Sequence, residues 1–338
     1  MIAPLSGFLA RGSVTDHREL KRIAKGLRDA PADGRYQSSE ADRFHRHFAP
    51  VEDRWIRYRV RVGDEVVVDG VVGEIPLEAL RGHEATLPAE SGRRRRQRLR
   101  SAMDIRPIVA FDRRGFPLVP FPDPDLVLET NDGSLHELAV VASGPRVEGP
   151  LVIADGHHRT EVAREHHAAV GGDGRAARIL GMVVPAGKGL RAASFHRRFA
   201  LAGRPVGLDR VFDVVPARRP GVPPPGGLLW WPGDGTPGLG LRLRPGTADL
   251  PPGHAGVPAA VAARHLLPLA GVEEHDAEYE GDVDAAVADL PAPGAALLLG
   301  DVPLASVRTA AETGHHLPPK ATRFTPKPLS GPITRPID

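Results

Sequence analysis

The residues best suited to chemistry in this chain lie in one short stretch, ADGHHR, at positions 154 to 159. An apolar run typical of a buried strand, LVIA, directly precedes Asp155 and Gly156, and a helical pattern begins at about His157. A helix start offers unpaired N–H groups and the positive end of the helix dipole, both of which favour an anion such as phosphate. Gly156 permits close backbone approach, and Arg159 can make a forked contact with phosphate oxygens. The stretch is therefore a candidate phosphate site.

The side chains around this turn suit more than one arrangement. Asp155 is a candidate ligand for Mg²⁺ or for a substrate hydroxyl, and His157 and His158 complete the polar set. The pattern equally suits a simpler arrangement, in which Asp155 only caps the helix and both histidines lie on the surface of its first turn. Spacing alone leaves both interpretations open.

Two further motifs lie far from the turn in the sequence: His83-Glu84 in RGHEATLP, and PKATR at positions 319 to 323. With DGHHR they resemble the motifs of the free L-serine kinases of the ParB/sulfiredoxin-like superfamily. They also resemble a related bacterial family of unknown function that carries IADGHHR. All three occur in the family's order, from about residue 80 to residue 331.

The resemblance implies a ParB/sulfiredoxin-like fold of the α/β (α+β) class and a kinase that transfers a phosphoryl group from ATP or ADP, with Mg²⁺, to a hydroxyl of free L-serine or a similar compound. Such a protein is a phosphotransferase with an alcohol group as acceptor. The roles it implies are catalytic for Glu84 (the base) and Asp155 (with the metal), nucleotide-binding for Asp155, Gly156, His157, His158 and Arg159, and substrate-binding for His83, Lys320, Thr322 and Arg323.

Some positions depart from the family's pattern. Thr160 stands where the family of unknown function has an aromatic residue, Ala321 replaces a Ser or Thr, and no APPYD-type segment is found near the N-terminus. A divergent member that acts on another hydroxy compound, or has lost catalysis, is therefore a further hypothesis. HEATL also lacks the second histidine of HExxH, which argues against a zinc protease.

Composition narrows the class of protein. The 338 residues contain no cysteine, so disulfides and thiolate chemistry are excluded. The formal charge is +2, and no helix-turn-helix pattern is found, so a nucleic-acid partner is disfavoured. No apolar run approaches membrane-spanning length, and we expect a soluble cytoplasmic protein. Nearly all positive charge is arginine, since lysine occurs at five positions: Lys21, Lys25, Lys188, Lys320 and Lys327.

An arginine-rich run, RRRRQRLR at positions 93 to 100, supports a second functional hypothesis. Such a run is most often a solvated helix face, but it also suits nucleic acid or nucleotide phosphates. Because ParB-like folds also bind and hydrolyse CTP on DNA, a nucleotide-binding regulatory or DNA-associated protein is the alternative to a kinase.

Periodicity and turn residues predict the main elements. A Gly- and Pro-rich stretch after residue 203 predicts a boundary between a catalytic domain, 1–205, and a smaller α/β domain, 206–338, whose tail (315–331) returns to the active site. The expected helices are 16–30, 157 onwards, 258–270 (interrupted by Pro268), 282–290 and 305–314. The expected strands are 54–62, two short ones within 63–76, 107–111, a hairpin at 127–141, 151–154, 179–187, 228–232 and 294–300.

Overall fold

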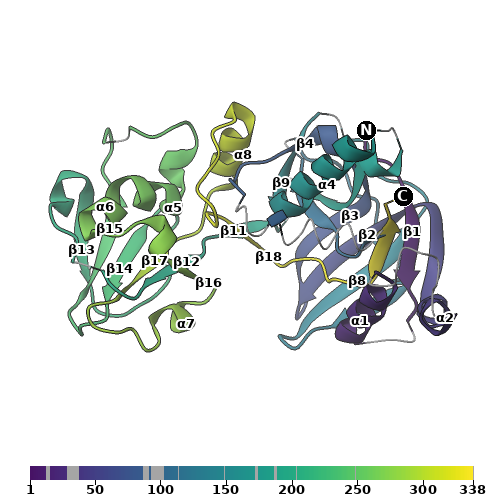
Figure 1. Cartoon of the computed structure of the whole chain (residues 1–338), viewed down its shortest axis with the longest axis horizontal. Helices are drawn as coiled ribbons and strands as arrows, with labels where there is room; N and C mark the ends of the chain where they lie inside the picture. The colour runs from purple at the N-terminus through teal and green to yellow at the C-terminus, as the bar shows by residue number, and fades with distance from the viewer. Residues whose placement is uncertain are drawn as a thin grey trace. The chain divides into compact units, whose positions relative to one another are not determined.

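The computed structural model (Figure 1) describes residues 1–338 except 13–15, 29–37, 87–90, 93–102, 113, 148, 172–173, 186–188, 203, 248 and 338. The arginine run at 93–100 lies outside the described residues. The chain forms two compact units. Unit 1 comprises residues 1–81, 86–190 and 326–338, and unit 2 comprises residues 82–85 and 191–325.

These units differ from the two predicted domains, which met at residue 205. The first division falls after Leu190 instead of near residue 205, because the strands at 191–193 and 196–199 pair with strands of unit 2. Residues 82–85, which carry the His-Glu motif, also belong to unit 2. The end of the chain, from Pro326, belongs to unit 1.

Unit 1 is built on one large mixed sheet. Among its described residues the sheet has eleven strands, in the order β4-β9-β6-β10-β3-β2-β1-β19-β5, with β8 paired to β2 and β7 to β8. Most neighbours are antiparallel, whereas β4 with β9 and β6 with β10 are parallel. Its elements are β1 (Leu5–Ala10), α1 (His17–Arg28), α2 (Ser38–His47), β2 (Phe48–Val62), β3 (Glu65–Pro76), η1 (Leu77–Ala79), β4 (Leu80–Arg81), β5 (Met103–Asp104), β6 (Ile108–Phe111), β7 (Leu126–Glu129), β8 (Ser134–Val141), β9 (Leu151–Asp155), α4 (His157–Val170), η2 (Arg175–Ala177), β10 (Arg178–Val184) and β19 (Ile333–Pro336).

One strand prediction in unit 1 is wrong. The stretch 63–76 forms a single long strand, β3, and not two short ones. Gly70 lies within this strand and does not end it. A Cβ at Gly70 would lie 2.6 Å from the carbonyl oxygen of Val183 in β10. The glycine therefore permits close strand packing within the sheet, a role that turn statistics do not distinguish from chain reversal.

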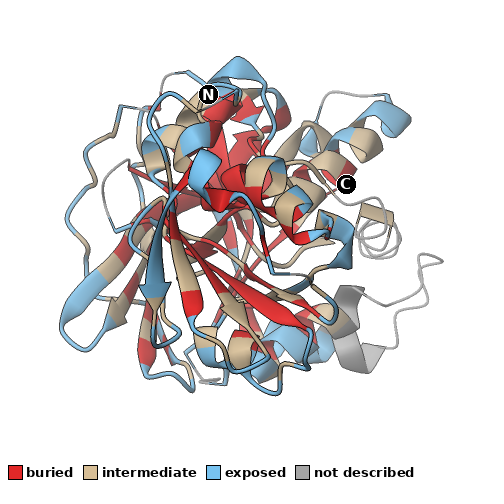
Figure 2. Ribbon diagram, turned by 90° about the vertical axis from the view of Figure 1, so that its left-hand side faces the viewer, coloured by how far each residue is buried: buried red, intermediate tan, exposed pale blue. Residues whose placement is uncertain are grey.

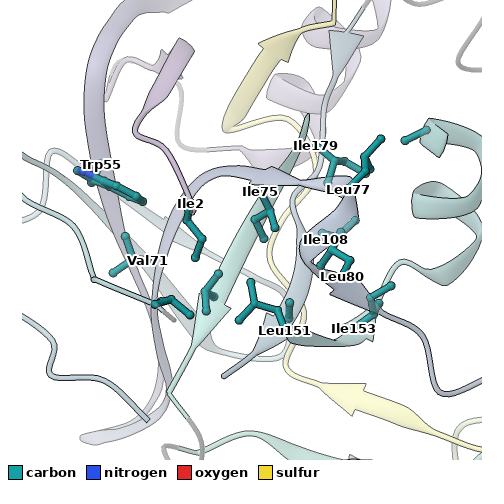
Figure 3. Packing of buried hydrophobic residues seen from close by; sticks show 14 residues of the cluster. Ile2, Trp55, Val71, Ile75, Leu77, Leu80, Ile108, Leu151, Ile153 and Ile179 are labelled. Atoms are coloured by element: carbon teal, nitrogen blue, oxygen red, sulfur yellow. The ribbon is translucent and has the colours of Figure 1, made fainter. Parts of the chain in front are cut away.

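The core of unit 1 lies between the sheet and the elements that cover it (Figure 3). Apolar residues from β3, β6, β9 and β10 pack together with Leu77 of η1, Leu80 of β4 and Ala163 of α4. Burial follows the strands, and exposed residues gather on the connecting loops (Figure 2). The four residues before Asp155 are all buried, so β9 is packed into the core and Asp155 lies at the edge of the core.

Unit 2 has its own antiparallel sheet. Six strands of its described part pair in the order β13-β15-β14-β17-β12-β16, and a separate pair joins β11 to β18. The tryptophan-rich β14 lies inside the sheet between β15 and β17, as expected for a core strand. Its elements are β11 (Arg191–Ala193), β12 (His196–Phe199), η3 (Leu208–Arg210), β13 (Phe212–Ala217), β14 (Leu228–Pro232), β15 (Gly238–Leu243), η4 (His254–Gly256), α5 (Pro258–Val261), the π-helical η5 (Ala262–Leu266), α6 (Leu267–Ala270), η6 (Glu274–Asp276), β16 (Glu278–Glu280), α7 (Val283–Val287), β17 (Ala295–Leu299), α8 (Leu304–Thr313) and β18 (Arg323–Thr325).

The mixed α/β class predicted from the sequence is confirmed, with sheets and helices in both units. Within the described residues, no helix combines the length and the apolar character needed to cross a membrane.

Candidate active site

The predicted strand, turn and helix around DGHHR are all present in unit 1. β9 ends at Asp155, and α4 begins at His157. Gly156 between them has φ 114°, and a Cβ at this position would lie 2.5 Å from the Ile108 side chain of β6. Only glycine therefore fits this turn, both for its backbone conformation and for the space that Ile108 leaves.

Asp155 lies among positive charges. Its Oδ2 accepts a hydrogen bond from Arg159 Nη2 at 2.6 Å, and its Oδ1 accepts one from Lys327 Nζ at 2.5 Å. Burial alone would raise the pKa of the Asp155 carboxyl, but the charges of Arg159, Lys327 and Arg106 more than offset it and hold that pKa well below its ordinary value. Asp155 is therefore an ionised anchor for cationic side chains.

This arrangement excludes the simpler interpretation of Asp155 as a helix cap. Gly156 is the N-cap of α4, and no side chain caps this end of the helix. The carboxylate instead accepts bonds from Arg159, in the first turn of α4, and from Lys327 near the C-terminus.

The two histidines of the motif lie at the start of α4, and both are partly buried. His158 Nδ1 lies 3.1 Å from Ser91 Oγ, and Ser91 Oγ donates to Glu161 Oε2 at 2.5 Å. His158 is thus bound to the chain segment just before the arginine run. The sequence pattern does not distinguish the two histidines and does not predict this contact.

The arrangement does not fit a magnesium ion held by Asp155. Both carboxylate oxygens are bound by cationic side chains, which repel a divalent cation, and magnesium sites in proteins use one or two carboxylates with phosphates and water. In the described part of the chain, no group of three His, Asp or Glu side chains could hold a metal. We therefore assign no catalytic step to a metal on Asp155.

The segment Pro326–Gly331 carries Lys327 across unit 1 and is held by several bonds. Arg106 Nε donates to the carbonyl of Pro328 at 3.1 Å, and Gly331 N donates to the carbonyl of Ile105 at 2.8 Å. Leu329 N donates to the hydroxyl of Tyr58 at 2.9 Å. Lys327 is thus placed by the residues that directly follow it, which are hydrogen-bonded at three positions.

Beneath this segment, two buried aromatic side chains form a polar pair. Tyr58 Oη lies 2.9 Å from His136 Nδ1. Since the Tyr58 oxygen already accepts from Leu329, the phenol donates to an unprotonated Nδ1. Burial lowers the pKa of His136 to about 4, so the neutral imidazole persists at neutral pH.

The other two motifs meet in unit 2, although 236 residues separate Glu84 from Lys320. Leu317 N donates to the carbonyl of His83 at 2.7 Å, and Ala85 N donates to the carbonyl of Leu317 at 3.1 Å. These two bonds form a short parallel β-bridge around Glu84. The bridge aligns the His-Glu and PKATR motifs side by side.

Glu84 is bound entirely by neutral donors. Its Oε1 accepts from Lys320 N at 2.8 Å, and its Oε2 accepts from Thr322 N at 3.1 Å and Thr322 Oγ1 at 2.9 Å. Burial raises the pKa of Glu84, and these hydrogen bonds only partly oppose the rise. Because Oε1 accepts a single bond, it retains capacity for a further donor.

The remaining residues of these motifs take different positions. His83 is fully buried, and its Nε2 lies 3.0 Å from Thr322 Oγ1, so it supports the contact between Thr322 and Glu84. Lys320 adopts a left-handed conformation with φ 57°, and its ammonium lies 5.5 Å from the ring centre of Phe195. Arg323 donates to the carbonyl of Gly281 and not to Glu84.

His196 and Arg197 of β12 make contacts within unit 2. Arg197 is fully buried, and its Nη2 pairs with Glu274 Oε1 at 2.8 Å. His196 Nδ1 accepts from Leu299 N at 3.1 Å within the sheet. The Arg197 guanidinium is therefore bound to protein acceptors, and His196 Nδ1 is used within the sheet.

The candidate residues thus form two groups. In unit 1, Asp155, Gly156 and Arg159 gather with Lys327 and Arg106, and in unit 2, Glu84 gathers with His83, Lys320 and Thr322. Lys327 was not among the site residues predicted from the sequence. The available signal was a second Pro-Lys pair, in FTPKP, in a chain with only five lysines.

The fold and the site described above can be compared with known proteins. No family model and no curated protein sequence matches the chain. Similar solved structures include SbnI with a C-terminal truncation from Staphylococcus aureus, at 12% identity and a TM-score of 0.43, covering 77% of this chain and 85% of that one.

A free serine kinase in complex with AMP is also similar, at 12% identity and a TM-score of 0.38, with 78% of this chain and 92% of that one covered. A conserved hypothetical protein from Pyrococcus furiosus matches at 13% identity and a TM-score of 0.37, with coverages of 76% and 93%. The free serine kinases, which the sequence motifs resemble, are thus among the solved structures similar to this chain.

Proposed function

We propose that this protein is a small-molecule kinase, which transfers the terminal phosphoryl group of ATP or ADP to a hydroxyl, with free L-serine as the first acceptor to test. The donor enters as its magnesium complex. The observation that carries the proposal is the contact between Glu84 and the PKATR segment, which joins two distant motifs around one buried carboxyl.

The unit 1 group suits the donor. Nucleotide phosphates carry several negative charges, and Arg159, Arg106 and Lys327 surround a single carboxylate next to the start of α4. In the proposed function, the donor's phosphates bind to the turn from Asp155 to Arg159. Asp155 holds the cations in position and does not itself contact a metal.

The unit 2 group suits the acceptor. A general base works best when its pKa lies near the working pH, and burial moves the pKa of Glu84 in that direction. In the proposed reaction, the acceptor O–H proton passes to Glu84 Oε1, and the acceptor oxygen bonds to the terminal phosphorus. The bond from that phosphorus to the bridging oxygen then breaks, and the shortened nucleotide leaves.

Lys320 and Thr322 are the proposed acceptor-binding residues. The Lys320 ammonium near Phe195 can bind the acceptor's carboxylate, whereas the Thr322 hydroxyl holds Glu84 in place. Arg323, which the resemblance assigned to the acceptor, has a proposed role only in anchoring this segment to Gly281. His83 is likewise proposed as a support for Thr322.

The proposal is tested by phosphorus NMR of the full chain with magnesium, L-serine and either ATP or ADP. We expect a phosphomonoester signal that grows with time. Glu84→Gln should lower its rate about 100- to 10,000-fold, the range for loss of a general base. Glu278→Gln, an exposed glutamate of unit 2, is the matched control and should keep the rate.

Other outcomes would redirect or end the proposal. An intact nucleotide with L-serine would exclude serine, and a panel of other hydroxy compounds would then be the test of any transfer. Hydrolysis without a phosphomonoester would instead support a nucleotide-hydrolysing regulatory protein. If Glu84→Gln kept the full rate while remaining folded, the assignment of the base would be wrong.

A further inference from the structure

Lys327 is the one lysine that contacts the DGHHR turn among the described residues, and no motif used above assigns it a role. We propose that Lys327 binds phosphate groups of the nucleotide directly, with Asp155 as its positioning residue. This inference deepens the proposed function, because it names a further ligand of the proposed donor site. It rests on three features of unit 1.

The first feature is placement. The residues that directly follow Lys327 are held by the bonds from Arg106 to Pro328, from Leu329 to Tyr58 and from Gly331 to Ile105. Asp155 Oδ1 then fixes the ammonium at 2.5 Å. A flexible lysine side chain loses much rotamer freedom when it binds an anion. Because Asp155 already orders the Lys327 side chain, most of this entropy is lost before the ligand binds.

The second feature is the charge balance. Three cations, Arg106, Arg159 and Lys327, lower the pKa of one carboxylate, Asp155, so cationic side chains outnumber this carboxylate at the turn. A single cation would be enough to balance the charge of the Asp155 carboxylate. The excess positive charge at a helix start next to a glycine turn suits a ligand with at least two negative charges, such as a diphosphate.

The third feature is access. The Lys327 side chain is 33% exposed, compared with 21% for Arg159 and 17% for Asp155. An ammonium has three donors, and Asp155 accepts one of them. Lys327 can therefore keep its contact with Asp155 and still donate to a phosphate oxygen.

The expected ligand is thus a polyphosphate tail, and the probe is inorganic pyrophosphate with EDTA present. We would measure its affinity for the full chain by calorimetry. Lys327→Met should weaken binding about 10- to 100-fold, the loss of a charge-assisted bond, and Lys327→Arg should restore most of it. Lys21→Met, at an exposed lysine of α1, is the control and should bind like the unmodified chain.

A second measurement needs no variant. Acetylation of lysines with an amine-reactive ester, read by mass spectrometry, should be slowed at Lys327 by pyrophosphate and remain unchanged at Lys21. A purely structural ion pair would lower the melting temperature of Lys327→Met without this protection.

The outcomes separate this inference from the proposed kinase. Absence of pyrophosphate binding, or equal affinity of Lys327→Met, would overturn the inference, whatever the NMR assay shows. Lys327-dependent binding without any phosphomonoester in that assay would support the inference and count against the kinase.

Discussion

The two groups of candidate residues hold their central carboxyls in opposite ways. Asp155 in unit 1 is bound by the charged side chains of Arg159 and Lys327, and its pKa is lowered. Glu84 in unit 2 is bound by backbone N–H groups and the Thr322 hydroxyl, and burial raises its pKa. The charged form of the carboxyl is thus favoured in one place and disfavoured in the other, because the surroundings differ in charge and burial.

The largest effect should come from breaking the unit 1 group at its turn. Gly156→Ala places a Cβ against Ile108 and forces a positive φ on alanine, so it should destabilise the protein by about 3 kcal/mol and abolish pyrophosphate binding. Urea unfolding and calorimetry measure both effects. Gly171→Ala at the other end of α4 also has positive φ, but its Cβ meets no atom within 4 Å, and it should cost only about 1 kcal/mol. Equal losses for the two variants would contradict this account of the turn.

An intermediate effect should distinguish the two carboxyls by the sign of their pH dependence. The pKa of Asp155 is lower in the folded chain, so its stabilisation is present above the unfolded value of about 3.9 and is lost as the pH falls. The loss of stability in Asp155→Asn, about 2 kcal/mol at neutral pH for a partly exposed pair, should therefore shrink in acid.

Glu84 should behave in the opposite way. Its folded pKa is raised, so its contribution is present below the unfolded value of about 4.3 and is lost as the pH rises through the folded pKa. Glu84→Gln, which cannot ionise, should gain stability relative to the unmodified chain as the pH increases. Urea unfolding between pH 3 and 8 compares the two variants, and slopes of the same sign would refute the contrast.

The smallest effect should come from adjusting the donors of Glu84. Thr322→Val removes the hydroxyl that donates to Oε2, and about 1 kcal/mol of stability should be lost with it. Because that hydroxyl lowers the pKa of Glu84, its removal should move the acidic limb of the rate profile to higher pH. The profile of transfer rate against pH measures this shift. Thr325→Val in β18 is the control, and an unchanged limb in Thr322→Val would mean that another group limits the rate.

Local sequence patterns were sufficient to predict the turn at Asp155 and Gly156. A buried apolar run, then Asp-Gly, then a helical pattern predicted β9, the turn and α4, because each of these depends on neighbouring residues alone. The hairpin of β7 and β8 was predicted for the same reason. The extended β3 was not, since Gly70 serves the packing against β10, which no local pattern records.

The partners of the candidate side chains could not be predicted in this way. The motif order indicated that Glu84 and PKATR belong together, and the structure shows the bonds that join them, from backbone groups that carry no sequence signature. Arg323, by contrast, lies on Gly281, although its place in the motif resembles that of its neighbours. Side-chain direction after a left-handed residue such as Lys320 depends on the tertiary contacts around it.

The sequence by itself determined the chemistry that is available: a glycine turn after a buried strand, a carboxyl in a His-Glu pair, and lysines confined to a few places. Only the tertiary structure decided how that chemistry is used. It set Lys327 and Arg159 on Asp155, and neutral donors on Glu84, through contacts between segments far apart in the chain. The physical reason is that a carboxyl's pKa and role depend on the charge and burial of its neighbours in space, which folding alone brings together.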